Sequence, residues 1–207
     1  MREPQAQRHT LVVLHTGDRV ILASASPRRK ELLARLVPDF EIIAADIDED
    51  ALTGADPIDS AIRIARAKAE KIGSDNQDAL VIAADTIVFT KDGGTFRQLG
   101  KPADAVEARE MLRHLSGREH TVVTGVCLMR GRELRSFAET TDVQFRALHE
   151  SEINEYVATG EPLDKAGAYA IQGGAAAFVE SYSGSLSNVI GLPMEALETN
   201  LGLGQNQ

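Results

Sequence analysis

The sequence predicts an α/β fold with a mixed, twisted β-sheet and helices on its faces. Apolar strand-like runs alternate with helical patterns over the first half of the chain, which is typical of parallel strand–helix–strand units. Two long strand-like runs then follow one another over 119–129 and 133–146, joined at Gly131, as in an antiparallel pair. Because helices on such a sheet leave a crevice at the strand ends, we expect two lobes around a cleft.

Local signals set the elements of the first half. Ser26 is a good N-cap and Pro27 suits the first helical position, and Asp56-Pro57 repeats that pattern. Gly73 stops the second helix. The elements expected in chain order are a strand over 20–24, a helix over 27–36, a strand over 40–44, a helix over 57–71 and a strand over 80–90.

The second half begins with a hairpin turn at Lys91-Asp92-Gly93-Gly94, followed by a capping box over 104–107. The further elements expected are a helix over 104–116, the two strands named above, a helix over 150–158, a strand over 175–180 and a last helix opened by Pro193. We predict a single domain over 20–207 and a loosely attached N-terminal extension over 1–19, in which 11–14 could form a short strand.

Composition limits the classes of function. The chain has 207 residues, 43% hydrophobic and 26% charged, which suits one ordinary globular domain. The net charge of −9 argues against a nucleic-acid polymer as partner, although local basic residues and a divalent metal could still bind a small polyphosphate. With no long apolar run, no secretory leader pattern and the single Cys127, we expect a cytoplasmic protein without a membrane partner.

The segment Ser24-Ala25-Ser26-Pro27-Arg28-Arg29-Lys30 predicts an anion site. It places three cations in the first turn of a helix, where the macrodipole disfavours positive charge by about 0.3–1 kcal/mol each. A departure of this kind usually has a cause outside the fold. We therefore expect a phosphate held by backbone N–H groups, hydroxyls and arginines.

Asp85 interrupts an apolar strand over 80–90. Aspartate is depleted in strands, and burying its charge costs several kcal/mol unless the carboxylate is paired. It is therefore either a structural residue at a strand bulge, bonded to backbone, or a general base or metal ligand.

Lysines and carboxylates elsewhere are ambiguous by position. Lys68 lies at the edge of the apolar stripe of its helix, so a snorkelling side chain is the simpler interpretation. Lys101 lies on a loop between Gly100 and Pro102, where it could reach a phosphate or be merely solvated. The acidic run over 46–50 is either a solvated loop or a source of Mg²⁺ ligands.

Residues 163–174 are rich in small side chains, which let a backbone approach a ligand closely or pack a tight turn. Within them, Gln172 carries both a donor and an acceptor and could read a base edge. Other chemistries are excluded, because the sequence has no Walker A pattern, no zinc spacing among its histidines and no nucleophile elbow. Cys127 lies in an apolar run and reads as a core residue.

Taken together, these segments resemble the signature of the Maf nucleotide pyrophosphatases, in order and with matching spacing from about Val20 to Leu201. The motifs that carry the resemblance are Leu22-Ala23-Ser24-Ala25-Ser26-Pro27-Arg28-Arg29, Ala84-Asp85-Thr86-Ile87-Val88, Gly100-Lys101-Pro102, Leu115-Ser116-Gly117, Thr141-Asp142-Val143 and Asp164-Lys165-Ala166-Gly167-Ala168-Tyr169.

The resemblance implies a Maf/ITPase-like fold with a nucleotide-binding cleft and hydrolysis of a nucleoside triphosphate to monophosphate and pyrophosphate. It implies a divalent cation (Mg²⁺, Mn²⁺ or Co²⁺) at Glu49 and Asp85, and it allows a homodimer. Asp85 matches the family's proton acceptor, and Lys68 and Lys101 match polar site residues, which reverses the snorkelling interpretation of Lys68.

The resemblance also bears on the base. Arg28, Thr86 and Gln172 look like the combination of the branch that acts on dTTP and UTP, with modified pyrimidine nucleotides as a further substrate class. Ser24 and Ser26 would then grip phosphate whatever the base, while Arg29 and Lys30 do no more than add positive field. Two alternatives stay open: a preference for 7-methyl-GTP or another non-standard nucleotide, and a nucleotide-binding regulator of cell division.

Overall fold

A computed structural model describes residues 12–203. These residues fold around a seven-stranded sheet in the order β2-β1-β3-β5-β6-β7, with β4 paired to β3 outside this path. The strands are β1 (Val20–Leu22), β2 (Glu41–Ile42), β3 (Leu80–Asp92), β4 (Thr95–Leu99), β5 (Glu119–Arg130), β6 (Glu133–Phe145) and β7 (Val179–Ser183). β1 is parallel to β2 and β3, and the remaining pairs are antiparallel, which confirms the mixed sheet.

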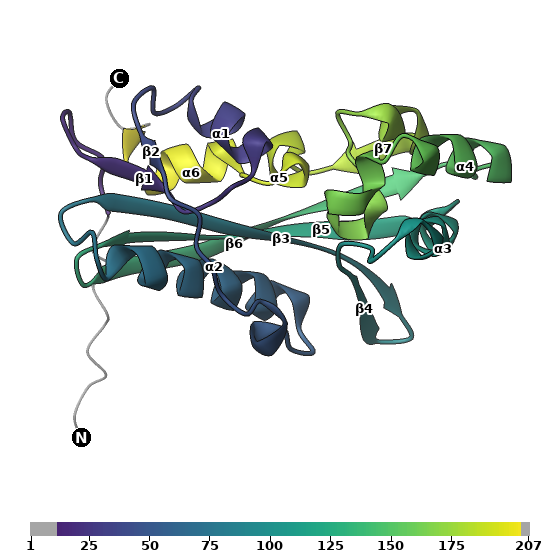
Figure 1. Cartoon of the computed structure of the whole chain (residues 1–207), viewed down its shortest axis with the longest axis horizontal. Helices are drawn as coiled ribbons and strands as arrows, with labels where there is room; N and C mark the ends of the chain where they lie inside the picture. Colours follow the sequence, from purple (N-terminus) through teal and green to yellow (C-terminus); the bar gives the residue numbers. More distant parts are fainter. Residues whose placement is uncertain (1–11, 204–207) are drawn as a thin grey trace.

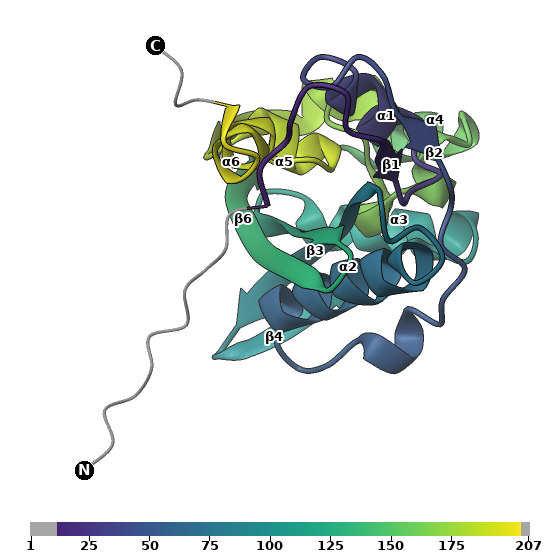
Figure 2. The same cartoon turned by 90° about the vertical axis from the view of Figure 1, so that its left-hand side faces the viewer.

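Helices cover both faces of this sheet, as Figure 2 shows, with α2 on one side and α1, α5 and α6 on the other. The long strands β3, β5 and β6 continue to the opposite end of the molecule, where α3, α4 and β7 gather (Figure 1). The helices are α1 (Pro27–Leu33), α2 (Pro57–Gly73), α3 (Ala105–Leu115), α4 (Glu150–Ala158), α5 (Leu186–Ile190) and α6 (Met194–Asn200).

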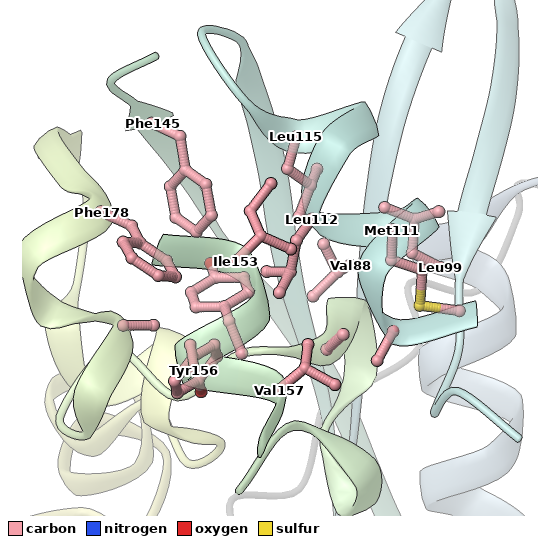
Figure 3. Packing of buried hydrophobic residues seen from close by; sticks show 14 of the residues in the cluster. Val88, Leu99, Met111, Leu112, Leu115, Phe145, Ile153, Tyr156, Val157 and Phe178 are labelled. Atoms are coloured by element: carbon pink, nitrogen blue, oxygen red, sulfur yellow. The ribbon is translucent and has the colours of Figure 1, made fainter. Parts of the chain in front are cut away.

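The two-residue period of β3 divides its side chains between these layers. Ile82 and Ala84 pack in the cluster that contains α1 and α6 residues, whereas Val81 and Ala83 pack with residues of α2. A separate cluster fills the other end of the sheet (Figure 3), where Phe145 lies edge-on to Phe178. Two hydrophobic lobes therefore share one set of long strands, as expected.

Three local expectations are wrong. The strand expected over 175–180 is a 3₁₀ helix at Gly174–Phe178 followed by β7, because three consecutive alanines have poor strand propensity. The helix expected over 27–36 ends at Leu33. Residues 12–14 form no strand, and Leu11 lies outside the described residues.

The prediction of a loosely attached N-terminal extension is also wrong for residues 12–19, the part of it that the structure describes. Val12 is 2% exposed and packs in the cluster beneath α6, and the Leu14 amide donates to the Leu201 carbonyl at 3.1 Å. Asp18 pairs with Arg130 at the end of β5. Residues 12–19 are therefore attached to the sheet domain, because their apolar side chains bury surface on it.

Within residues 12–203, no helix combines the length and the apolar character needed to cross a bilayer.

Candidate active site

The cleft follows from a gap in the edge of β3. Of β3, only Leu80–Ile82 pair with β1, and β4 pairs with the same edge again from Val88 to Asp92. Residues 83–87 are thus left with a strand partner on the β5 side alone. A cleft of about 980 Å³ opens at this gap, and Asp85 and Thr86 lie in its wall.

All nine residues proposed from sequence line this one cleft: Ser24, Ser26, Arg28, Glu49, Lys68, Asp85, Thr86, Lys101 and Gln172. They come from the loop after β1, the start of α1, the acidic run, α2, β3, the loop after β4 and the turn before the 3₁₀ helix at 174–178. The structure therefore brings together segments that are up to about three quarters of the chain apart.

Asp85 faces α2, where it meets Lys68. The Lys68 ammonium donates to Asp85 Oδ1 at 2.8 Å and contacts Glu49 Oε1 at 2.7 Å. The Lys68 and Asp85 side chains are 9% and 11% exposed, so the snorkelling interpretation of Lys68 is wrong. Asp85 Oδ2 accepts no hydrogen bond from any residue among 12–203, which leaves this oxygen available to a ligand in the cleft.

This contact depends on an unusually close approach of α2 to the sheet. Gly125 of β5 stands opposite Asp85 in the β3–β5 ladder. A Cβ on Gly125 would lie 2.4 Å from the backbone carbon of Ala61 and 2.6 Å from the amide nitrogen of Ile62. Only glycine allows the α2 backbone to pack this low, and the low position carries Lys68 to Asp85.

Glu49 has a lowered pKa. Burial raises this pKa, but the hydrogen bond and charge of Lys68 outweigh burial, and Lys101 and Arg29 act in the same direction. Glu49 therefore stays ionised through the physiological range. Two carboxylates, Glu49 and Asp85, therefore lie with the cations of Lys68, Lys101 and Arg29 in one region of the cleft.

Arg29 is more than a source of positive field, and the expectation that it only adds charge is wrong. Its Nη2 donates to Thr86 Oγ1 at 3.0 Å, its Nη1 to Ser24 Oγ at 3.3 Å and its Nε to the carbonyl of Gly191 at 2.8 Å. Burial lowers the pKa of this guanidinium, while the Asp85 and Glu49 carboxylates raise it. The sequence signal was the doubled arginine, which could not show which of the two is bonded within the fold.

The loop before α1 forms as predicted. Ser26 Oγ caps the helix by accepting the Arg29 amide at 3.4 Å, and Ser24 Oγ accepts the Ser26 amide at 3.2 Å. Arg28 lines the cleft, and no hydrogen bond or ion pair joins its side chain to another residue among 12–203. Lys30 is exposed and lies outside the cleft lining.

The other wall carries Lys101 and Gln172, both exposed. The loop with Lys101 is tied down by the Gly167 amide, which donates to the Gly100 carbonyl at 3.1 Å. Sequence reasoning missed a second lysine on this wall, Lys165, whose side chain is 11% exposed and pairs with Asp164. It gave no separate signal because it stands inside a run of small residues.

The chain offers a divalent cation only a partial shell. Across the described part of the chain, no three His, Cys, Asp or Glu side chains gather as a preformed metal site. Asp85 and Glu49 nevertheless converge on one point, since both contact the Lys68 nitrogen. Two carboxylates with an open cleft beside them suit Mg²⁺, which usually takes one or two protein carboxylates and completes its shell with phosphate and water.

Comparisons with known proteins show which family this chain resembles. The family model described as "Maf-like protein" matches residues 19–202. A dTTP/UTP pyrophosphatase of Anaeromyxobacter dehalogenans is 53% identical over 183 residues, which are 86% of this chain and 90% of that protein. A dTTP/UTP pyrophosphatase of Geotalea uraniireducens is 46% identical over 184 residues, 88% of this chain and 93% of that protein. A solved HAM1 protein from Coxiella burnetii is 18% identical with a TM-score of 0.49, over 90% of this chain and 100% of that one.

Proposed function

This chain belongs to the Maf-like protein family, and on that premise we propose that it is a nucleoside triphosphate pyrophosphatase that hydrolyses dTTP and UTP to the monophosphate and pyrophosphate. The observation that carries the proposal is the buried contact of Lys68 with Asp85, inside a cleft that also holds Arg28, Arg29 and Lys101. The resemblance read from the sequence motifs is confirmed by the family match.

In the proposed reaction, the oxygen of a water molecule forms a bond to the α-phosphorus. The bond from the α-phosphorus to the bridging oxygen breaks, and pyrophosphate leaves with that electron pair. Asp85 accepts the proton of the water, and its oxygen Oδ2 is the one free to do so. Lys68 holds the other oxygen and thereby fixes the direction of the carboxylate.

Positive charge from three residues would stabilise the triphosphate and the leaving pyrophosphate. Lys68, Lys101 and Arg29 all lower the pKa of Glu49, so they lie close enough to stabilise the negative charge of a phosphate bound beside it. Ser24 and Ser26 complete this phosphate end. A divalent cation held by Glu49 and Asp85 would neutralise phosphate charge and supply an activated water.

The base end is proposed at Arg28, Thr86 and Gln172. Thr86 is held in place, because its hydroxyl bonds both Arg29 and Thr124 Oγ1, the latter at 2.9 Å. Arg28 and Gln172 are the two residues of this group whose side chains make no hydrogen bond within residues 12–203, which leaves them free to bind a pyrimidine.

The test is a panel of triphosphates with product analysis, run with Mg²⁺, Mn²⁺ and Co²⁺. We expect UMP and pyrophosphate from UTP, TMP and pyrophosphate from dTTP, and much slower turnover of purine triphosphates and 7-methyl-GTP. Release of diphosphate and orthophosphate would contradict the reaction class. Asp85→Asn should lose most turnover and still bind nucleotide, and near-normal turnover in this variant would refute the role of Asp85.

A further inference from the structure

Gln172 sits on a turn whose backbone is anchored on both sides while its own side chain is free. The turn lies between Tyr169, whose hydroxyl bonds His120 Nε2 at 2.8 Å, and Gly174 at the start of the 3₁₀ helix. Within it, the Gly173 amide donates to the Ala170 carbonyl at 3.0 Å. Two residues that none of the proposed roles uses hold this turn from the α4 side.

The first is Tyr156 of α4. Its hydroxyl oxygen accepts the Ala170 amide at 3.1 Å, in buried surroundings. The ring is 5% exposed and stands edge-on to Phe178 with centroids 5.3 Å apart (Figure 3), so the hydroxyl cannot move away from the turn easily. Burial raises the pKa of Tyr156, and the charge of Glu161 raises it further, which keeps the phenol neutral.

The second is Glu161, just after α4. Its Oε2 accepts the Gly174 amide at 2.9 Å. A Cβ on Gly173 would lie 1.8 Å from Glu161 Oε1, so the carboxylate occupies the space that any side chain at position 173 would take. The pair Gly173-Gly174 therefore leaves room for a carboxylate to hold the turn directly after Gln172.

We propose that Glu161 and Tyr156 are positioning residues for base recognition, which fix the turn so that the Gln172 amide is presented to the pyrimidine in one orientation. This inference rests on the proposed function and deepens it. A glutamine on a loose turn would lose both side-chain and backbone conformational entropy when the ligand binds. On an anchored turn the backbone entropy is already lost on folding, so ligand binding costs less.

The expected effect is on selectivity more than on chemistry. Neither residue lines the cleft, whereas Gln172 does. Glu161→Ala should lower kcat/KM for UTP and dTTP by about tenfold, mainly through KM, since misplacing a contact group by an ångström costs up to about 100-fold. The slow hydrolysis of dGTP should change by less than about twofold, so the pyrimidine preference falls by nearly the whole factor.

The chain offers matched variants. Glu161→Gln keeps an oxygen that can accept the Gly174 amide and should restore most of the preference. Gly173→Ala should displace the Glu161 carboxylate and reproduce Glu161→Ala without touching position 161. Glu155→Ala, at an exposed position of α4, is the control and should behave as wild type. If Glu161→Ala does not fold, Gly173→Ala carries the test.

The deciding measurement is kcat and KM for UTP, dTTP and dGTP in these variants, alone and combined with Gln172→Ala. If Glu161 acts through Gln172, Glu161→Ala has no further effect on selectivity once Gln172 is alanine. Unchanged selectivity in Glu161→Ala and Gly173→Ala, or an equal loss for all three nucleotides, would overturn the inference alone. A wild-type protein that hydrolyses neither pyrimidine triphosphate would overturn the proposed function and the inference with it.

Discussion

Replacing Lys68 with methionine removes one charge from the cleft lining and keeps the unbranched stem of the side chain without its terminal nitrogen. Asp85 then loses its only hydrogen-bond partner among residues 12–203 while its side chain stays 11% exposed. Glu49, 44% exposed, can turn toward water, so the cost falls mainly on Asp85. Breaking a buried pair by removing one partner costs about 3–5 kcal/mol, and we expect the lower end, about 3 kcal/mol.

For a chain of this size, each kcal/mol lowers the melting temperature by about 2–4 °C, so Lys68→Met should melt about 6–12 °C below wild type. Calorimetry without metal or nucleotide measures this. Lys71→Met is the control, because Lys71 is exposed on the same helix and its replacement should cost less than about 0.5 kcal/mol. Lys68→Met should also lose at least about 100-fold in turnover of UTP, as expected for removal of one preorganised charge.

Combination with Asp85→Asn separates the ion pair from packing. With a neutral amide at position 85 the lysine has less to stabilise, so the two substitutions should cost less together than the sum of their separate effects, by at least about 1 kcal/mol. Strict additivity, or a melting temperature for Lys68→Met no lower than that of Lys71→Met, would refute the reasoning.

Four further predictions concern the surroundings of the site. His120 has its pKa lowered to about 4, chiefly by burial, so the folded protein binds fewer protons than the unfolded chain below pH 6.5. Its stabilising contribution is complete above pH 6.5 and falls by about 3 kcal/mol by pH 4, and urea unfolding across this range should show a loss that His120→Gln lacks. Because the pKa of Glu49 is lowered, the stability difference between wild type and Glu49→Gln should be fully present at pH 7 and disappear as the pH falls below the ordinary glutamate pKa and through the lowered pKa of Glu49. A difference that stays constant over this pH range would contradict the prediction. Gly125→Ala should lift α2 from the sheet, destabilise the protein by about 1–3 kcal/mol and impair turnover, since its Cβ meets backbone atoms that cannot turn aside. Arg29→Lys keeps the charge, but its single nitrogen cannot reach the three acceptors that Arg29 bonds through three different nitrogens, so it should cost about 1–2 kcal/mol and lower turnover, whereas wild-type behaviour would restore the view that Arg29 supplies only positive field.

The sequence was most informative where a residue broke a local rule. Asp85 within an apolar strand and the two arginines at the start of α1 proved to lie in the cleft, because burying or crowding charge is costly enough to stand out. The order of strands and helices followed from apolar periodicity and from caps such as Ser26 and Asp56, whose side chains accept the first helical amides. These signals act over a few residues and are visible without tertiary structure.

Features that depend on distant partners could not be predicted in this way. Lys68 reads as a surface lysine until its helix packs against Gly125, and the spacing of α2 alone does not show that approach. The 3₁₀ helix that begins at Gly174 was not predicted, because the Gly174 amide is bonded by the carboxylate of Glu161, 13 residues earlier in the chain. The apolar run over 11–14 suggested a short strand, but it could not show that Val12 packs with Leu201 at the other end of the described chain.

The two neighbouring arginines explain why the first turn of α1 tolerates its cations. α1 has only seven residues and Ser26 already takes one of its free amides, so the helix end by itself is a weak anion site. Arg29 has its N–H donors satisfied within the fold by two hydroxyls and a carbonyl, and it thereby ties together Ser24 and Thr86 in the cleft lining. Arg28 points into the same cleft with no such partners. The unfavourable position of these cations at the helix N-terminus is thus offset for Arg29 by its hydrogen bonds within the fold. For Arg28 it is left to a negatively charged ligand to offset.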